Sequence, residues 1–314
     1  ILKIVSEWFY ENEFATMSSL VAVIGNVGGI LALTPLVFVV SLISWRYTFI
    51  AIGTIGLVLS VLAFLVIRNK PSDIGLPDVR PAAANTGNKK TGIMRALGGV
   101  IKNPYTWPPF LMVFGFQGAY QCFVGTWGQT YLMDVYGLDK TGASNLVTMM
   151  ITGMAAGCLF FGKLSDKLLK RKLPLLVLGT VFITAWGVLV FYGGGKLPAV
   201  MLWVVLLIIV VAYSTITLTW VCAKEVNDPE FSGLSTSFAN IGGFMGSAIT
   251  PIIFGAVLDK YRGTIDTVQL YHKAMLPCFI SAMLGYVSML MLKETGCRNI
   301  YKILYNGDEG GIKL

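Results

Sequence analysis

Two glutamines stand one helical turn apart in a stretch of chain that carries no charged residue. Gln117 and Gln121 lie within residues 103–133, and Tyr120 shares their face if this stretch is helical. An amide without a partner is costly in apolar surroundings, so each needs another helix, water or a bound solute. Trp127 falls on the same face one heptad beyond Tyr120. Amides beside aromatic walls are typical of small-molecule pockets, and we predict that these four side chains bind a solute.

Two further rows of polar and aromatic side chains occur in other uncharged stretches. Asn145 and Thr148 lie three residues apart, and Tyr213, Thr217 and Trp220 recur at i, i+4 and i+7. Both rows are candidates for the walls of the same pocket. The alternative is hydrogen bonding between helices, at about 0.6 kcal/mol each, or an aromatic belt at a membrane interface for Trp220. Both interpretations stay open for these five residues.

Patterns of catalytic and metal-binding residues are missing from these stretches. No Asp, Glu, Lys, Arg or His occurs inside them, and the single histidine, His272, stands at a rim. None of the five cysteines has the spacing of a metal ligand or a disulfide framework. We therefore expect no enzyme, no cofactor and no metal site. The sequence also carries no nucleic-acid-binding motif, and we expect no nucleic-acid partner.

Composition indicates that lipid surrounds most of the chain. Its 314 residues are 55% hydrophobic and 13% charged, with a mean hydropathy of +0.71, whereas soluble domains carry about 25% charged residues. A helix needs about 20 apolar residues to cross a bilayer, and only helices and closed barrels satisfy their backbone there. We predict an all-α polytopic membrane protein with one partial and eight complete spans. The eight uncharged windows are 14–45, 47–67, 103–133, 141–162, 173–195, 197–223, 231–258 and 274–292.

Basic residues are distributed unequally between the two ends of the predicted spans. Eighteen of the 24 Lys and Arg residues fall on the side of the linker and the C-terminus, and six fall on the other side. Because cytoplasmic loops are enriched in Lys and Arg, we predict that the linker and the C-terminus are cytoplasmic. The net charge of +8 reflects this asymmetry.

The positions of the charged residues divide the chain into four parts. Residues 1–67 hold a partial helix and two complete ones, and residues 68–104 form a polar, proline-containing linker. A block of six helices follows over 105–292, and a short tail over 293–314. Within the linker we expect a short surface helix over Ile93–Lys102.

An internal repeat relates two of the predicted spans. Residues 13–36 and 230–252 both begin with Glu-Phe, continue to Asn-x-Gly-Gly and end near Thr-Pro. Paired glycines let neighbouring helices approach closely, and proline permits a bend, so we assign these residues to helix packing or gating. Both copies run in the same direction, as in a parallel repeat. The repeated residues are Asn26, Gly28, Gly29 and Pro35, and Asn240, Gly242, Gly243 and Pro251.

Several segments in order resemble the major facilitator superfamily. Trp8–Phe14 is similar to the charged turn that follows the family's fourth helix, and Trp45–Phe49 is similar to the start of its sixth. A basic loop resembles the family's G-x-L-x-D-R-x-G-R-R motif between helices eight and nine, where Leu169 replaces the second glycine. In the family, the aspartate of this loop bonds a neighbouring helix end. The matching loop residues are Gly162, Asp166, Lys167 and Arg171.

The resemblance implies a secondary transporter of a small, polar organic solute that works by alternating access. It further implies a fragment that begins at the end of the fourth helix, so that any coupling carboxylate or anion-binding arginine lies in the missing helices. We expect a monomer in the cell (inner) membrane, with the lipid bilayer and a small-molecule substrate as partners and a coupling proton or ion left open. The alternative is a sensor with the same fold that does not transport.

Overall fold

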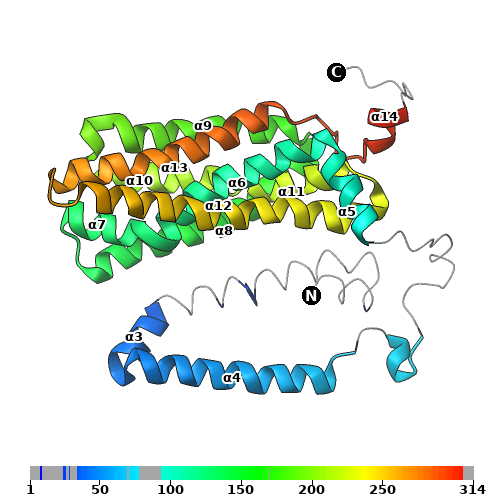
Figure 1. Ribbon diagram of the computed structural model, residues 1–314, viewed down its shortest axis with the longest axis horizontal. Coiled ribbons are helices and arrows are strands. Elements are labelled where there is room, and N and C mark those ends of the chain that lie inside the picture. Colours follow the sequence, from blue (N-terminus) through cyan, green and yellow to red (C-terminus); the bar gives the residue numbers. More distant parts are fainter. Residues whose placement is uncertain are drawn as a thin grey trace. The chain divides into compact units, whose positions relative to one another are not determined.

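The computed structural model describes residues 8, 24–25, 28, 34–68, 71–77, 93–168 and 170–306. Every regular element in these residues is a helix (Figure 1). The chain divides into two units, Ile1–Thr91 and Gly92–Leu314, and the division falls inside the predicted linker.

The first unit consists of two helices and a short turn where it is described. Helix α3 (Thr34–Ile43) is followed by Ser44 and then by α4 (Trp45–Val66), and a 3-10 turn, η1, covers Pro71–Ile74. Helix α4 contains 22 residues with a single arginine near its start, and only Thr48 is buried. Its other apolar side chains are exposed except Ala63, which is half-buried.

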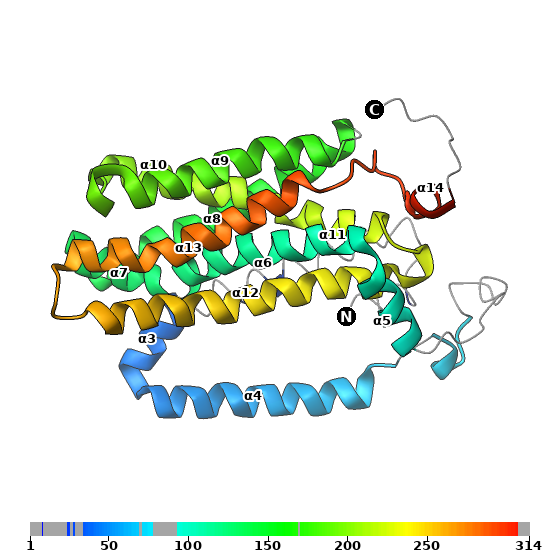
Figure 2. The same cartoon turned by 45° about the horizontal axis from the view of Figure 1, so that its top comes forward.

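The second unit is a bundle of long helices that lie roughly along one direction (Figures 1 and 2). It opens with α5 (Ile93–Lys102), the surface helix expected from the sequence, which packs Ala96 and Val100 inward. The following elements are η3 (Pro104–Thr106), α6 (Trp107–Cys122), the π-helical η4 (Phe123–Trp127), α7 (Gly128–Tyr136), α8 (Lys140–Leu168), α9 (Lys172–Phe191), η5 (Tyr192–Gly195), α10 (Ala199–Tyr213), α11 (Ile216–Glu225), η6 (Pro229–Phe231), α12 (Ser232–Tyr261), α13 (Thr267–Leu290) and α14 (Tyr301–Asn306).

In the described residues, five helices are long and apolar enough to cross a membrane. They cover 45–66, 172–194, 199–225, 232–261 and 267–290 and coincide with five predicted windows. Window 103–133 contains α6, η4 and α7, and window 141–162 lies inside α8. Window 14–45 falls mostly outside the described residues. The chain is therefore a helical membrane protein, while the total of eight complete spans and a partial one stays a prediction.

Small residues bring α6 into close contact with α12 and α13. A methyl group at Gly246 would collide with the backbone carbonyl of Phe114, and one at Gly115 would collide with the carbonyl of Ser281. Helices in lipid gain little from burying apolar surface, so such close backbone approach is what holds them together. These contacts fix the position of α6, which carries Gln117 and Gln121.

Candidate functional site: a tyrosine and amide cluster on α6 and α10

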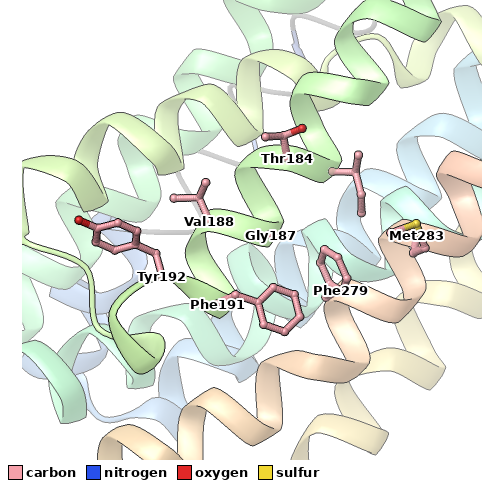
Figure 3. A pocket seen from close by; sticks show the side chains of 8 residues that line it. Thr184, Gly187, Val188, Phe191, Tyr192, Phe279 and Met283 are labelled. Carbon is pink, nitrogen blue, oxygen red and sulfur yellow. The ribbon is translucent and has the colours of Figure 1, made fainter.

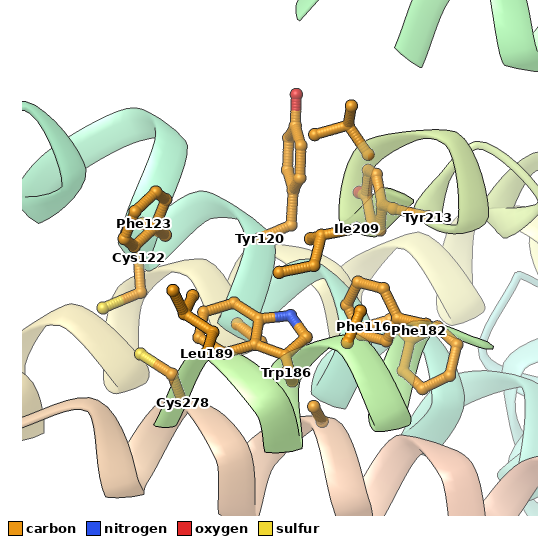
Figure 4. Packing of buried hydrophobic residues seen from close by; sticks show 14 of the residues in the cluster. Phe116, Tyr120, Cys122, Phe123, Phe182, Trp186, Leu189, Ile209, Tyr213 and Cys278 are labelled. Atoms are coloured by element: carbon orange, nitrogen blue, oxygen red, sulfur yellow. The ribbon is translucent and has the colours of Figure 1, made fainter. Parts of the chain in front are cut away.

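Three of the predicted residues meet between α6 and α10. The rings of Tyr120 and Tyr213 are stacked, with centroids 4.0 Å apart and planes 6° from parallel. The Tyr213 hydroxyl donates a hydrogen bond to Oε1 of Gln117. Tyr213 is 1% exposed and Gln117 is half-buried, so the amide lies between the packed interior and the accessible surface. Figure 4 shows Tyr120 and Tyr213 in the same core cluster as Trp186.

A glycine of α12 packs beside the stem of Gln117. A β-carbon at Gly243 would lie 3.4 Å from Cγ of Gln117 and 2.9 Å from Cγ1 of Val113. Such a contact is too close for Val113 to remain in place. The predicted packing residue Gly243 therefore lets α12 lie close to Val113, beside the stem of Gln117.

Gln121 follows one turn beyond Gln117 on the same helix. Its amide lies over the backbone of Gly125, where a β-carbon would collide with Nε2. No described residue forms a hydrogen bond with this amide, and the side chain is half-buried. Gln121 is thus a polar group of the cluster that remains available to a solute or to water.

Cys158 and Ser214 belong to the same region, although the sequence patterns did not single them out. The Cys158 thiol donates to the carbonyl oxygen of Ser214 over 3.4 Å. Ser214 follows Tyr213 in the turn between α10 and α11, and Gly157 packs against its side chain. The contact of Gly157 and Cys158 with a serine in this turn is close packing that only the three-dimensional structure reveals.

Trp127 does not contact the tyrosine pair. Its Nε1 donates to the carbonyl oxygen of Pro251 over 3.1 Å, and its ring stacks on Phe254 at 5.4 Å. The physical reason is the π-helical turn η4, which ends at Trp127. A π turn closes i to i+5 hydrogen bonds, so the side chains that follow it are rotated away from the face expected for a regular helix. Tyr120 therefore contacts α10, whereas Trp127 contacts α12.

The other two predicted rows are spread over different surroundings. Asn145 is exposed, and the Thr148 hydroxyl is buried without a hydrogen-bond partner among the described residues. Thr217 donates to the carbonyl of Ser214 over 3.4 Å, within its own helix start. Trp220 packs against the core, and its Nε1 has no partner in the described part of the chain. The turn between α10 and α11 interrupts the regular spacing that linked Tyr213 to Trp220.

Among the repeat residues, the second copy is described and most of the first is not. Asn26 and Gly29 lie outside the described residues, Gly28 is helical with open space around it, and Pro35 lies in α3. In the second copy Asn240 is exposed, and a β-carbon at Gly242 would lie 2.5 Å from the Phe110 carbonyl. Pro251 lies inside α12 and provides the carbonyl that Trp127 bonds.

In the loop that resembles the family motif, Arg171 has the best-defined surroundings. Gly162, Asp166 and Lys167 lie in α8, Lys167 is exposed, and Leu169 lies outside the described residues. Nε of Arg171 is 3.5 Å from Oε1 of Glu225 at the end of α11, and each side chain is 10% exposed. Thr295 donates to the other oxygen of Glu225.

A second carboxylate, Glu294, completes this polar cluster. It accepts hydrogen bonds from the backbone N–H groups of Arg171, Lys172, Thr295 and Gly296 over 2.9–3.1 Å. Burial acts to raise the pKa of Glu294, but these four donors outweigh burial and hold the pKa below its ordinary value. Glu225 and Glu294 were not singled out from the sequence; the available signal was a Lys-Glu pair directly after an uncharged window in both cases.

The tyrosine and amide cluster offers groups that can recognise a polar solute. Among the described residues, no group of three or more His, Cys, Asp or Glu could hold a metal ion. The tyrosine and amide cluster presents hydroxyl, carboxamide and ring faces within predicted membrane spans and has no charged member. Such groups can bind hydroxyl and carbonyl groups of a small solute.

This helical membrane bundle belongs to a known class of proteins. The family model described as Major Facilitator Superfamily matches residues 1–251. The chain belongs to the Major Facilitator Superfamily.

Three curated relatives illustrate the range within the family. The membrane sensor protein UhpC of Escherichia coli (strain K12) is 25% identical over 83% of this chain and 61% of the relative. The glycerol-3-phosphate transporter of Bacillus subtilis (strain 168) is 24% identical over 88% of this chain and 65% of the relative. The hexuronate transporter of the same organism is 26% identical over 94% of this chain and 70% of the relative. The chain thus spans less than two thirds of the length of the first two relatives.

Solved structures support the fold. The crystal structure of a bacterial homolog to the human lysosomal transporter Spinster, inward-facing and unoccupied, superposes with a TM-score of 0.61 at 16% identity. The superposition covers 93% of this chain and 74% of that one. At this level of identity the likeness concerns the fold alone.

Proposed function

We propose that this chain is part of a secondary transporter that moves a small, polar organic solute across the cell (inner) membrane by alternating access. The observation that carries the proposal is the cluster of Gln117, Tyr120 and Tyr213, which lies in two predicted spans of a Major Facilitator Superfamily chain. A polar group within lipid is expensive unless it has partners, and the half-buried Gln121 amide has none among the described residues. A solute is the partner that the proposal assigns to it.

The names of two relatives suggest the chemical class of the solute. Two transporters that resemble this chain are named after glycerol-3-phosphate and hexuronate. Both solutes are hydroxylated carbon chains with one acidic group. In our proposal the cluster binds the hydroxyl groups, because it offers amides and tyrosines and no cation. The acidic group would then be bound by a basic residue outside the uncharged windows. Orientation follows the basic residues, with the linker and the C-terminus in the cytoplasm.

A sensor that does not transport is the second candidate. It is favoured by one observation, which is the similarity to a relative named as a membrane sensor protein. The family fold serves both activities, so fold alone does not choose between them.

Counterflow in proteoliposomes separates the two candidates. The full-length protein is reconstituted into vesicles preloaded with glycerol-3-phosphate, with a hexuronate or with neither, and entry of the labelled solute is followed. If the protein is a transporter, labelled solute accumulates in vesicles that were preloaded with the same unlabelled solute and not in the empty vesicles. Binding of either solute without counterflow would contradict transport and favour the sensor. Gln121→Ala, run beside the wild type, should weaken counterflow at low solute concentration without lowering the amount of folded protein.

A further inference from the structure

The two amides of α6 lie on the accessible stripe of that helix. Over residues 112–122, the side chains of Phe114, Gln117 and Gln121 are half-buried and the others are buried. The depression between α9 and α13 is different, because its lining offers one threonine, one tyrosine and no amide (Figure 3). A solute that reaches α6 therefore meets Gln117 and Gln121.

The direction of the Gln117 amide is set by Tyr213. A carboxamide has two different ends, because its oxygen accepts hydrogen bonds and its NH₂ group donates them. The oxygen of Gln117 accepts from the Tyr213 hydroxyl, and Tyr213 is 1% exposed. If the amide were turned round, this hydroxyl proton would lie in the packed interior without an acceptor. Nε2 of Gln117 has no hydrogen-bond partner among the described residues and is not a buried atom, so the donor end faces the accessible side.

Gln121 has no such constraint. Neither end of its amide bonds to a described residue, and neither end is buried. The rise of the helix places it about 6 Å beyond Gln117, so one solute with several oxygens along its carbon chain can reach both amides. The stripe thus presents one amide of fixed direction and one that can turn.

Resting on the proposed function, we propose that Gln117 admits only a solute oxygen that accepts a hydrogen bond, and that Tyr213 is the positioning residue that imposes this direction. A hydroxyl, carbonyl or acid oxygen meets the requirement, whereas an ammonium group, which only donates, does not. Gln121 binds a second oxygen of the same solute in either direction. The substrate class is an oxygen-rich, hydroxylated carbon chain without an amine at this position.

Substitutions at Gln117 test the direction of the bond. In Gln117→Glu one carboxylate oxygen still accepts from Tyr213, but the other replaces the N–H donors with an acceptor, whereas Gln117→Met removes both ends. Binding of labelled glycerol-3-phosphate and of a labelled hexuronate to the full-length protein is measured in detergent. We expect both variants to lose affinity about tenfold or more, while Gln117→Glu keeps the wild-type melting temperature. A Gln117→Glu protein with wild-type affinity would overturn the proposal, because the solute would then be the donor.

Gln121→Glu is the matched control for charge. It adds the same charge one turn away, where the amide is free to turn. A carboxylate there still accepts from a solute hydroxyl, so affinity should fall by less than about threefold. Equal losses in Gln117→Glu and Gln121→Glu would show that the added charge alone acts, and would overturn the proposal. This comparison also decides the question if Gln117→Met fails to fold.

A double-mutant cycle tests the role of Tyr213. In a Tyr213→Phe background the Gln117 amide can turn, so Gln117→Met should cost about threefold in affinity rather than about tenfold. Losses that multiply in the double variant would show that Tyr213 only fills space, and would contradict its positioning role. Counterflow is measured on the same wild-type protein. Binding without counterflow would contradict transport alone, and the difference between Gln117→Glu and Gln121→Glu would still support the fixed amide.

Discussion

Replacement of Glu294 by glutamine tests how the ends of α9 and α13 are joined. The carboxylate accepts four backbone hydrogen bonds, three at Oε1 and one at Oε2. In Glu294→Gln, one acceptor oxygen becomes an NH₂ group, and the backbone N–H that faced it loses its partner. A hydrogen bond to a charged group contributes about 1.5–3 kcal/mol.

The expected loss follows from these contacts. Because Glu294 is only partly buried and the glutamine oxygen keeps some donors, we expect a destabilisation at the lower end of this range, about 1–2 kcal/mol. At about 2–4 °C per kcal/mol, the melting temperature should fall by about 2–8 °C. The assay is the loss of monodisperse protein on heating in mild detergent at pH 7.

Acid pH provides an internal check. The folded-state pKa of Glu294 is lowered, so its stabilisation is present above the unfolded pKa and is lost as pH falls through the folded value. The gap between wild type and Glu294→Gln should be full at pH 7 and should narrow below about pH 4.

The other end of α13 supplies the control. Asp266 caps the helix by accepting one hydrogen bond from the Gln269 N–H at 3.0 Å. Asparagine caps nearly as well, so Asp266→Asn should cost less than about 1 kcal/mol. Equal melting temperatures for wild type and Glu294→Gln at pH 7 would refute the reasoning, as would an equal fall in Asp266→Asn.

Three further predictions concern packing, a helix-to-helix bond and topology. Gly246→Ala should lower thermal stability by about 1–3 kcal/mol because its methyl group collides with the α6 backbone, and an unchanged melting temperature would contradict that contact. Trp127→Phe leaves the carbonyl of Pro251 without its donor and should cost about 1 kcal/mol in the same assay; no loss would show that the bond is not formed. In intact cells, an impermeant thiol reagent should label Lys196→Cys and spare Ser72→Cys, and the reverse pattern would overturn the proposed orientation.

The span positions could be predicted because charge is excluded from the hydrocarbon core. Windows 173–195, 231–258 and 274–292 coincide with α9, α12 and α13, since each charge placed in lipid is costly. The length of an uncharged window does not show, however, where the regular i to i+4 hydrogen bonding of the helix is interrupted. The π turn at Phe123–Trp127 and the turn after Tyr213 interrupt windows that looked continuous.

The same limit applies to the candidate site. Tyr120 and Tyr213 were predicted on separate helices, and no pattern within either helix shows that their rings stack. Trp127 was predicted beside Tyr120 because the two residues are seven apart, and this spacing places them on one face only in a regular α-helix. The π turn at Phe123–Trp127 rotates the Trp127 side chain towards α12 instead. Glu225 and Glu294 appear in the sequence as ordinary charges at span ends. Their importance depends on Arg171, which is distant in sequence from both.

The most direct test of the central claim is a paired measurement on Tyr213→Phe in the full-length protein. This change removes the hydroxyl that bonds Gln117 and leaves the ring to stack on Tyr120. Tyr286→Phe is the control, because it removes a hydroxyl 3.1 Å from that of Thr180 on the α9–α13 side. Uptake kinetics and melting temperature are measured on both. We predict that Tyr213→Phe raises the transport Km about fivefold or more while the control keeps the wild-type Km. An unchanged Km in a destabilised Tyr213→Phe protein would contradict the assignment of this cluster to the solute site.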